Sequence, residues 1–384
     1  MGWSYAGDVT SGLGALPGAA STPIGYVFAA RGTEHVTYMG LDFSLWELTR
    51  SAELWSATDL LAAVGLPALD DPSTARRYRD AGPNAYLFPS QGPRHVVYVT
   101  EDGAVHELWH DTSWHHNPIT ASVGGGPAVV ARPAAYSFTG TNTQHIDYIG
   151  ASDCHIHELW WDNDGWHHRD LTKDVGGPLA AANGALAGYA VDLYGTQYVD
   201  YVGEDGHIHE LRWIDGSWGD SDLSDLGGAT ADVQLPTPTG GICAFFFPPA
   251  GTRHVYYYGV DGLFHELAVD RGAWSHTDLA GELSPGGIAA YPFNGTRHVL
   301  FTSSDASIKE LWWLQGAWHM TDLRAASGGP EVRLVPLAGY ARDDTSTQHV
   351  FFHGSPSAHI NELVWRPNRW PPDVSFPPAR PIAQ

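Results

Sequence analysis

One motif repeats seven times along the chain, and this repeat constrains the fold more than any other feature of the sequence. The clearest copy spans residues 144–172 and reads QHIDYIGASDCHIHELWWDNDGWHHRDLT. Each copy starts at an anchor residue, which is His35, His95, His145, Tyr198, His254, His298 or His349. A glutamate follows twelve or thirteen residues later, at Glu47, Glu107, Glu158, Glu210, Glu266, Glu310 and Glu362. A tryptophan follows seven or eight residues after that, at Trp55, Trp114, Trp166, Trp218, Trp274, Trp318 and Trp370.

Each unit contains four short β-type runs, because a short aromatic piece such as residues 135–138 also precedes each anchor. Repeats of about 40–50 residues with four strands are the sequence signature of propeller blades. A blade can bury its two apolar faces only against neighbouring blades, so the ring must close. The sequence therefore predicts an all-β fold, a seven-bladed β-propeller of four-stranded antiparallel blades.

The two ends of the chain predict how the ring closes. Gly2-Trp3 and the residues after it resemble an isolated copy of the outermost strand, while Trp370-Pro371-Pro372 spoils that strand in the last unit. We expect the N-terminal strand to complete the last blade. The predicted domain is a single propeller over residues 1–370, and residues 371–384 are expected to form a Pro-rich C-terminal tail.

Charge and cysteine content limit the classes of partner. The formal net charge is −23, which disfavours nucleic acid and anionic membranes as partners. Cys154 and Cys243 occupy non-equivalent positions of different repeats, so we expect free thiols. The N-terminus has no signal-peptide pattern and no apolar run is long enough to span a bilayer. We expect a soluble protein, cytoplasmic or released without a recognisable signal peptide, and no membrane insertion.

Two interpretations of the anchor histidine and the glutamate are open. Strand alternation lets the two side chains meet across neighbouring strands, where they would form a buried hydrogen-bonded pair that fixes the register of each blade. Alternatively, the pair and a nearby tryptophan would form a cup for a sugar, with hydrogen bonds to hydroxyls and an indole face against the ring. The candidate indoles follow the glutamates by two or three residues: Trp109, Trp160, Trp312 and Trp365. The tryptophans of the repeat itself are expected in the core between blades.

The repeat resembles the fungal and bacterial fucose-binding lectins that are built as β-propellers. The resemblance is carried by segments such as His254-Val255-Tyr256-Tyr257 with His265-Glu266-Leu267 and Gly272-Ala273-Trp274, and by His298-Val299 with Lys309-Glu310-Leu311 and Gly316-Ala317-Trp318. It implies sugar sites between blades, each with an arginine, a glutamate twelve residues on and an aromatic residue. This chain has histidine where that family has arginine, and seven repeats where the fungal proteins have six. Arginines stand one position earlier, at Arg94, Arg253 and Arg297, where alternation points them to the other face.

The histidines and the differences between repeats leave other functions open. His155 with His157 and His207 with His209 could chelate a metal, although the pattern lapses to Trp46, Lys309 and Asn361 in other copies. A propeller enzyme, a lyase, cyclase or hydrolase with one site near the central channel and a His-bound metal, is the alternative. Its candidate residues are Cys243, His319, Met320, His353 and the segment 342–344. A protein-interaction platform is a third alternative.

We predict a non-catalytic, lectin-like propeller with several sugar sites between blades, with glycans or another small-molecule ligand as partner and no cofactor. The predicted ligand-binding residues are His95, Glu107, Trp109, His145, Glu158, Trp160, His254, Glu266, His298, Glu310, Trp312, His349, Glu362 and Trp365. No catalytic residue is predicted.

Overall fold

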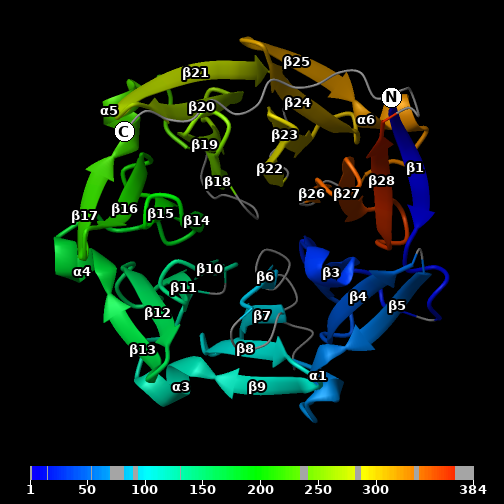
Figure 1. Cartoon of the computed structure of the whole chain (residues 1–384), viewed down its shortest axis with the longest axis horizontal. Helices are drawn as coiled ribbons and strands as arrows, with labels where there is room; N and C mark the ends of the chain where they lie inside the picture. Colours follow the sequence, from blue (N-terminus) through cyan, green and yellow to red (C-terminus); the bar gives the residue numbers. More distant parts are fainter. Residues whose placement is uncertain are drawn as a thin grey trace.

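A computed structural model of the chain describes residues 2–14, 16–52, 54–69, 82–89, 94–129, 131–233, 241–281, 287–332 and 337–367. These residues form seven four-stranded antiparallel sheets that stand around a common axis as the blades of a ring (Figure 1). The innermost strands are β2, β6, β10, β14, β18, β22 and β26, and each contacts the innermost strands of the two neighbouring blades. The predicted seven-bladed β-propeller is confirmed.

The blades are numbered here in chain order, with strands given from the axis outward. Blade 1 is β2 (Ile24–Phe28), β3 (Thr33–Met39), β4 (Leu45–Ser51) and β5 (Leu54–Asp59), and blade 2 is β6 (Asn84–Tyr86), β7 (Arg94–Val99), β8 (Val105–His110) and β9 (Trp114–Pro118). Blade 3 is β10 (Ala134–Phe138), β11 (Thr143–Ile149), β12 (Ile156–Asp162) and β13 (Gly165–Asp170), and blade 4 is β14 (Leu186–Val191), β15 (Thr196–Val202), β16 (Ile208–Ile214) and β17 (Ser217–Asp222). Blade 5 is β18 (Ile242–Phe247), β19 (Thr252–Tyr258), β20 (Leu263–Asp270) and β21 (Ala273–Gly281), and blade 6 is β22 (Ile288–Phe293), β23 (Thr296–Thr302), β24 (Ile308–Leu314) and β25 (Ala317–Asp322). Blade 7 is β26 (Ala338–Arg342), β27 (Thr347–His353), β28 (Ile360–Arg366) and the N-terminal β1 (Gly2–Asp8).

The core is a series of apolar layers between adjacent blades. The second strand of each blade is buried on both faces, because each face packs on a different neighbour. In one layer Ile149 and Ile156 of blade 3 pack with Val199 and Leu211 of blade 4. Close approach of the innermost strands requires small residues there, and a Cβ at Gly188 would lie within 2.5 Å of the Tyr136 ring of the preceding blade.

Short helices, which the sequence reading did not predict, follow the outermost strands. They are α1 (Leu60–Ala63), α3 (Ile119–Val123), α4 (Leu171–Val175), α5 (Leu223–Gly227) and α6 (Leu323–Ser327), and a 3₁₀ turn, η1 (Ala29–Arg31), follows β2. Asp59, Asp170, Asp222 and Asp322 each end an outermost strand and accept a hydrogen bond from a backbone N–H of the helix that follows. An aspartate at the N-cap satisfies a donor that the helix itself cannot. Each of these four outermost strands is therefore followed directly by a short helix whose N-terminus the aspartate caps.

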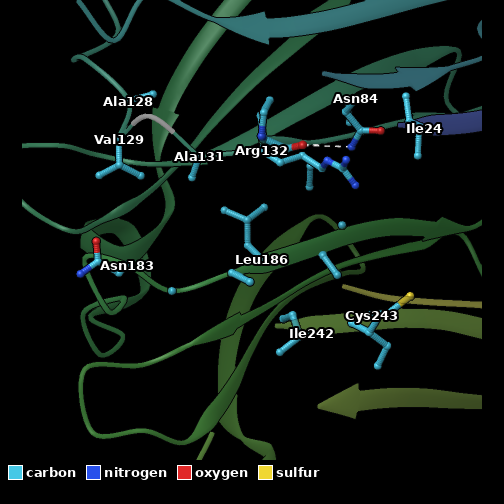
Figure 2. A pocket seen from close by; sticks show the side chains of 18 of the residues that line it. Ile24, Asn84, Ala128, Val129, Ala131, Arg132, Asn183, Leu186, Ile242 and Cys243 are labelled. Atoms are coloured by element: carbon cyan, nitrogen blue, oxygen red, sulfur yellow. Dashed lines mark hydrogen bonds between the residues drawn. The ribbon is translucent and has the colours of Figure 1, made fainter. Parts of the chain in front are cut away.

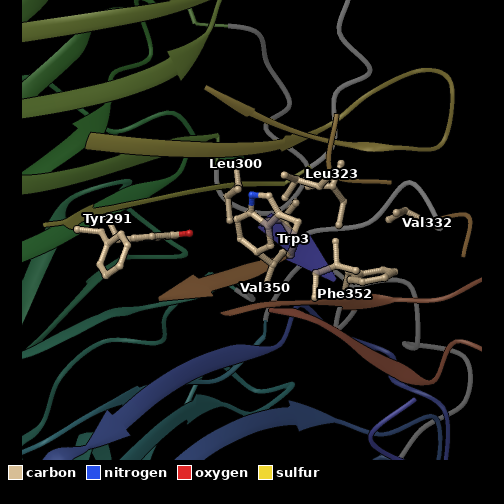
Figure 3. Packing of buried hydrophobic residues seen from close by; sticks show 11 residues of the cluster. Trp3, Tyr291, Leu300, Leu323, Val332, Val350 and Phe352 are labelled. Atoms are coloured by element: carbon tan, nitrogen blue, oxygen red, sulfur yellow. The ribbon is translucent and has the colours of Figure 1, made fainter. Parts of the chain in front are cut away.

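The N-terminal strand closes the ring, as predicted. β1 pairs antiparallel with β28, and Trp3 lies opposite Trp365 (Figure 1). The Trp3 side chain enters the core cluster between blades 6 and 7, next to Leu300, Leu323 and Val350 (Figure 3). Its indole Nε1 donates to Glu310 Oε2 at 3.0 Å. Residues far apart in the sequence thus hold the two ends of the chain together without a covalent link.

Three further predictions concern the thiols, the membrane and the tail. Cys154 and Cys243 are both free, as predicted. Within the described ranges, no helix has the length and apolar character needed to cross a bilayer. The Pro-rich segment 371–384 lies outside the described residues, so the boundary between the propeller and a tail stays a prediction.

Candidate functional site

The structure places each anchor histidine against the glutamate of its own blade. The Nδ1–Oε1 distance is 2.7 Å for His95–Glu107, His145–Glu158 and His349–Glu362, 2.8 Å for His298–Glu310 and 2.9 Å for His254–Glu266. His35 lies 3.4 Å from Glu47. In five blades the second ring nitrogen, Nε2, contacts the hydroxyl of a threonine two residues earlier at 2.6–2.9 Å. Both ring nitrogens of these histidines therefore have polar partners.

These pairs are buried in the sheet. His95 and Glu107 are both 0% exposed, and the other predicted histidine and glutamate ligands are at most 5% exposed. The inner-strand tyrosine covers the pair from the axis side: the Tyr86 ring stacks on His95 with centroids 5.0 Å apart, and its hydroxyl donates to Glu107 at 3.0 Å. A charge-assisted network of this kind stabilises the fold only when every member has a partner. This geometry agrees with the interpretation in which the histidine and the glutamate form a buried pair that fixes the register of each blade.

The residue just before each anchor joins neighbouring blades. It lies on the opposite face of its own strand from the anchor, as alternation predicts, and this face packs on the glutamate or tyrosine of the preceding blade. Arg94 donates to Glu47 at 2.5 Å, and Arg253 and Arg297 donate to Glu210 and Glu266. Where the residue is glutamine, its carbonyl instead accepts from the tyrosine of the preceding blade, as in Tyr86–Gln144 at 2.6 Å. Strand alternation predicts the orientation of these arginines, but it does not predict that their partners are the glutamates of the preceding blade.

In four interfaces, called here the arginine interfaces, a guanidinium fills the space beside the glutamate. Arg94, Arg253 and Arg297 fill the 1/2, 4/5 and 5/6 interfaces, and Arg50 of blade 1 fills the 7/1 interface, where it donates to Glu362 at 2.9 Å. Each guanidinium also lies over the tryptophan that follows in its own blade, at 4.9–5.1 Å: Trp55, Trp114, Trp274 and Trp318. The four arginine side chains are only 8–14% exposed. Ion pairing and cation–π contact together close these interfaces.

The other three interfaces, called here the glutamine interfaces, differ in two linked ways. Gln144, Gln197 and Gln348 replace the arginine at the 2/3, 3/4 and 6/7 interfaces. On the facing blade a tryptophan stands two residues after the glutamate and stacks on a histidine of the outermost strand. The ring centroids are 4.0 Å apart for Trp109–His115, 4.9 Å for Trp160–His167 and 4.4 Å for Trp312–His319. These three indoles are partly exposed, in contrast to the histidine–glutamate pairs beneath them.

Polar groups surround the three Trp–His pairs. Asn117, opposite Glu107 in the register, donates to its second oxygen at 2.9 Å. The guanidinium of Arg169 lies 5.0 Å from the Trp160 ring, and the Trp312 indole N–H donates to Thr321 at 3.3 Å. The surface at each pair therefore combines an aromatic face with hydrogen-bonding groups. Among the predicted indoles, Trp365 lies elsewhere: it is on the opposite face of its strand from Glu362 and contacts Phe293 of blade 6, with ring centroids 5.7 Å apart.

The interface charges shift the pKa values of the buried carboxyl groups in two directions. Burial alone would raise the pKa of Glu47, but His35 and Arg94 outweigh it and the pKa is lowered. Burial likewise opposes His254 and Arg297 at Glu266, whose pKa is also lowered. Blade 4, whose anchor is Tyr198, lacks the imidazole, and burial raises the pKa of Glu210 despite Arg253.

Blades 3 and 4 each carry a second buried carboxyl group that the sequence reading did not single out. Asp147 and Asp200 are 0% exposed and lie opposite Glu158 and Glu210 in the strand register. Burial, reinforced by the charge of the neighbouring glutamate, raises the pKa of each aspartate well above its usual value. In both aspartates the shift favours the neutral form of the carboxyl group.

Among the residues that the structure describes, four groups of side chains have the composition and spacing that could hold a metal ion. They are Asp153/His155/Asp170, Asp205/His207/Asp222, His265/His276/Asp278 and Glu34/His349/Glu362, each with ligand atoms within 4.8 Å of one another. The last group already surrounds the Arg50 guanidinium. His155 and His157, considered as a chelating pair from the sequence, have ring centroids 6.2 Å apart. His155 bonds Asp170 at 2.8 Å and His157 bonds His168 at 3.1 Å, and metal binding by the two histidines stays a prediction.

The residues considered for a single enzymatic site do not gather in one place. Cys243 lines the axial cavity, whereas His319 and Met320 lie on β25, the outermost strand of blade 6. His353 is buried at the end of β27. Arg342 pairs with Glu34 at 2.6 Å and with Asp344 at 2.6 Å.

Comparison with known proteins identifies solved structures that share the fold of this chain at low sequence identity. No protein-family model and no curated protein matches this chain. Among solved structures, the BP39L lectin from Burkholderia pseudomallei aligns with a TM-score of 0.68 at 17% identity, covering 91% of this chain and 96% of that one. AofleA from Arthrobotrys oligospora aligns with a TM-score of 0.55 at 16% identity, covering 83% and 89%. A variant of the Aleuria aurantia lectin in complex with Fucα1-6GlcNAc aligns with a TM-score of 0.53 at 18% identity, covering 83% and 96%. The chain therefore shares the β-propeller fold of these proteins.

Proposed function

We propose that this protein binds carbohydrate without catalysing a reaction, and that its sugar sites lie at the three glutamine interfaces. The observation that carries the proposal is the linked change at these interfaces, where a glutamine replaces the arginine and a partly exposed tryptophan stacks on a histidine. That the similar folds belong to proteins described as lectins supports the same class of ligand.

The chemistry of the Trp–His pairs suits a sugar ring. One face of a pyranose carries C–H groups that pack on an indole, and its hydroxyls need donors and acceptors around that contact. Trp109, Trp160 and Trp312 supply the aromatic surface, and His115, His167 and His319 each stack on one of these indoles and hold it in place. Asn117, Arg169 and Thr321 stand next to the pairs as hydrogen-bonding groups.

The buried histidine–glutamate pairs have a supporting part in this proposal. Glu107 has no exposed surface and already accepts from Tyr86, His95 and Asn117, so it holds Asn117 in place and does not itself touch the sugar. At the arginine interfaces, too, the repeat residues do not touch the sugar, because the guanidinium lies over the indole and each occupies the other. We therefore propose three sites per chain.

Fucosides are the first sugars to test. Two of the similar structures are described as complexes with α-methyl fucoside, and another as a complex with a fucose-containing disaccharide. The anchor histidines are buried and cannot offer a guanidinium fork, so preference among sugars has to come from the groups around the exposed indoles. A specificity other than fucose would leave the three-site proposal intact.

A glycan array on the fluorescently labelled protein tests the function. Wild type is compared with a triple variant, Trp109→Ala with Trp160→Ala and Trp312→Ala, and with the control Tyr194→Ala, which removes an aromatic ring that is 49% exposed on blade 4. We expect specific binding that free monosaccharide competes away, unchanged in the control and lost in the triple variant, with far-UV circular dichroism unchanged in all three. A blank array for wild type contradicts the proposed function. Binding retained by the triple variant and abolished by Arg94→Gln would move the sites to the arginine interfaces.

A further inference from the structure

The axis of the ring contains a cavity that the sugar sites do not use. Its volume is about 990 Å³, and the first residues of innermost strands from all seven blades line it, including Ile24, Ala134, Ile242 and Ala338. The lining is mostly small and apolar, with alanine and glycine recurring at equivalent positions of the inner strands. Polar side chains are few among the lining residues, and a concave site with a small number of polar side chains among apolar ones is the usual form of a small-ligand pocket.

Arg132 brings a positive charge into this lining. It stands two residues before β10, beside Asn84 and Ile24, with Ile242 and Cys243 across the cavity (Figure 2). Its Nη2 donates to the carbonyl of Thr22 at 3.1 Å, and a glycine at position 82 leaves room for it, since a Cβ there would lie 2.9 Å from that nitrogen. Within the described part of the chain its guanidinium forms no ion pair.

The environment of Arg132 differs from that of the interface arginines. Arg50, Arg94, Arg253 and Arg297 each meet a carboxylate, whereas burial lowers the pKa of Arg132 to about 10 with only the Cys243 thiol opposing that shift. A guanidinium has five N–H donors, and one carbonyl satisfies only one of them. The Asn84 amide beside it is already engaged at both ends, because its oxygen accepts from Ala85 N–H at 2.8 Å and its nitrogen donates to Pro133 O at 2.9 Å.

Among the described residues, the cation therefore has no acidic partner, in a place where an anion would be strongly favoured. Low-dielectric walls strengthen an ion pair relative to the same pair in water. Glu101 and Asp102 also line the cavity, but both are exposed, so solvent screens them. The net charge of −23 works against a general attraction for anions, so anion binding in this cavity depends on the local charge of Arg132.

We propose that the axial cavity binds a small organic carboxylate, whose anionic end pairs with Arg132 and whose apolar body packs on the alanine-rich wall of the inner strands. This site is separate from the glutamine interfaces and does not depend on carbohydrate binding. It gives the protein one axial ligand per chain in addition to the sites between blades.

Titration calorimetry with benzoate and with benzamide, its neutral isostere, tests the proposal. Wild type is expected to bind one equivalent of benzoate per chain and to bind benzamide at least tenfold more weakly. Arg132→Gln should lose at least tenfold in benzoate affinity, and Arg132→Lys, which keeps the charge, should lose less. The control Arg271→Gln removes a guanidinium that is 93% exposed and should change nothing. Absence of saturable benzoate binding, equal binding of benzamide, or equal benzoate binding by Arg132→Gln would each overturn the proposal.

The comparison of benzoate with benzamide on wild type shows whether binding requires the carboxylate, even if Arg132→Gln fails to fold. A second measurement locates the site: Ile242→Trp, which narrows the cavity across from Arg132, should weaken benzoate binding without changing binding on the glycan array. Unchanged benzoate affinity in a folded Ile242→Trp protein would place the anion elsewhere and contradict the axial site.

Discussion

Truncating Trp3 to alanine should destabilise the whole propeller, although Trp3 is the third residue of the chain. The side chain is 8% exposed and packs between blades 6 and 7. A buried indole removes about 150–250 Å² from water, which at about 25 cal/mol per Å² corresponds to roughly 4–6 kcal/mol. The hydrogen bond from its Nε1 to Glu310 at 3.0 Å adds roughly 1.5–3 kcal/mol because the acceptor is charged.

Partial burial in the unfolded chain and relaxation around the cavity reduce this sum. We therefore expect Trp3→Ala to lower the free energy of unfolding by about 3–5 kcal/mol, in the range for tryptophan truncation in cores. The unfolding entropy of 384 residues is about 0.8 kcal/mol/K, at about 2.1 cal/mol/K per residue, so the corresponding fall in the thermal midpoint is roughly 4–6 °C. Deletion of residues 1–8 should cost more, because it also leaves β28 as an unpaired edge.

Differential scanning calorimetry measures both variants, with Leu54→Ala as the control because that leucine is 76% exposed on another outermost strand. The control should melt like wild type. A single cooperative transition at a lower temperature for Trp3→Ala is the expected result. If Trp3→Ala or the deletion melts within about 1 °C of wild type, the N-terminal strand does not close the ring energetically and the reasoning is refuted.

Three further predictions concern buried titratable groups. Glu107→Ala should lower the free energy of unfolding in urea by about 3–5 kcal/mol, because it removes the buried carboxylate that bonds Tyr86, His95 and Asn117, whereas Glu107→Gln should cost less. His106 lies 2.9 Å from His116, and burial together with that neighbour lowers the pKa of His106 to about 4. The contribution of neutral His106 to the free energy of unfolding should therefore be fully present above about pH 6.5 and be lost as the pH drops toward 4. The fall in urea midpoint with pH should be shallower in His106→Gln. The pKa of Asp147 is raised, so its contribution is present at low pH and lost as the pH rises; Asp147→Asn should raise the urea midpoint at pH 8 more than at pH 4, and an equal change at both would contradict the assignment.

The seven-fold repeat made the fold and the closure of the ring predictable. Blade topology follows from four runs per repeat, and the isolated Gly2-Trp3 copy had no place except the incomplete last blade. The meeting of anchor histidine and glutamate was also predictable, because it depends on alternation within one sheet.

Contacts between blades were harder to predict, because alternation says which face a residue is on but not what covers that face. Arg94 was placed correctly on the far face of β7, yet its partner Glu47 belongs to the preceding blade and becomes visible only when the ring is assembled. A signal was present in the sequence: glutamine before the anchor coincides with a tryptophan two residues after the preceding blade's glutamate, as for Gln144 and Trp109. Trp365 follows Glu362 by three residues, whereas the other three indoles follow their glutamates by two. On a strand a spacing of three puts the second residue on the opposite face, so Trp365 does not lie beside Glu362.

The histidine surplus has a largely structural explanation that spacing could not reveal. The position before the glutamate carries a side chain that reaches back to an aspartate of the preceding turn, as in His209 with Asp205 at 3.1 Å and Lys309 with Asp305 at 3.1 Å. Because lysine and histidine can both serve, the role is donation of a hydrogen bond to the turn. The lapse to Lys309 is thus conservative in that role.

Counting the sugar sites in solution tests the central claim most directly. Isothermal titration of the protein with the monosaccharide that best competes on the array gives the number of equivalents bound per chain. We expect three equivalents for wild type, two for Trp109→Ala and none for the triple variant that also carries Trp160→Ala and Trp312→Ala. Seven equivalents for wild type, or a number that does not fall when these folded variants lose their indoles, would contradict the assignment of the sites to the glutamine interfaces.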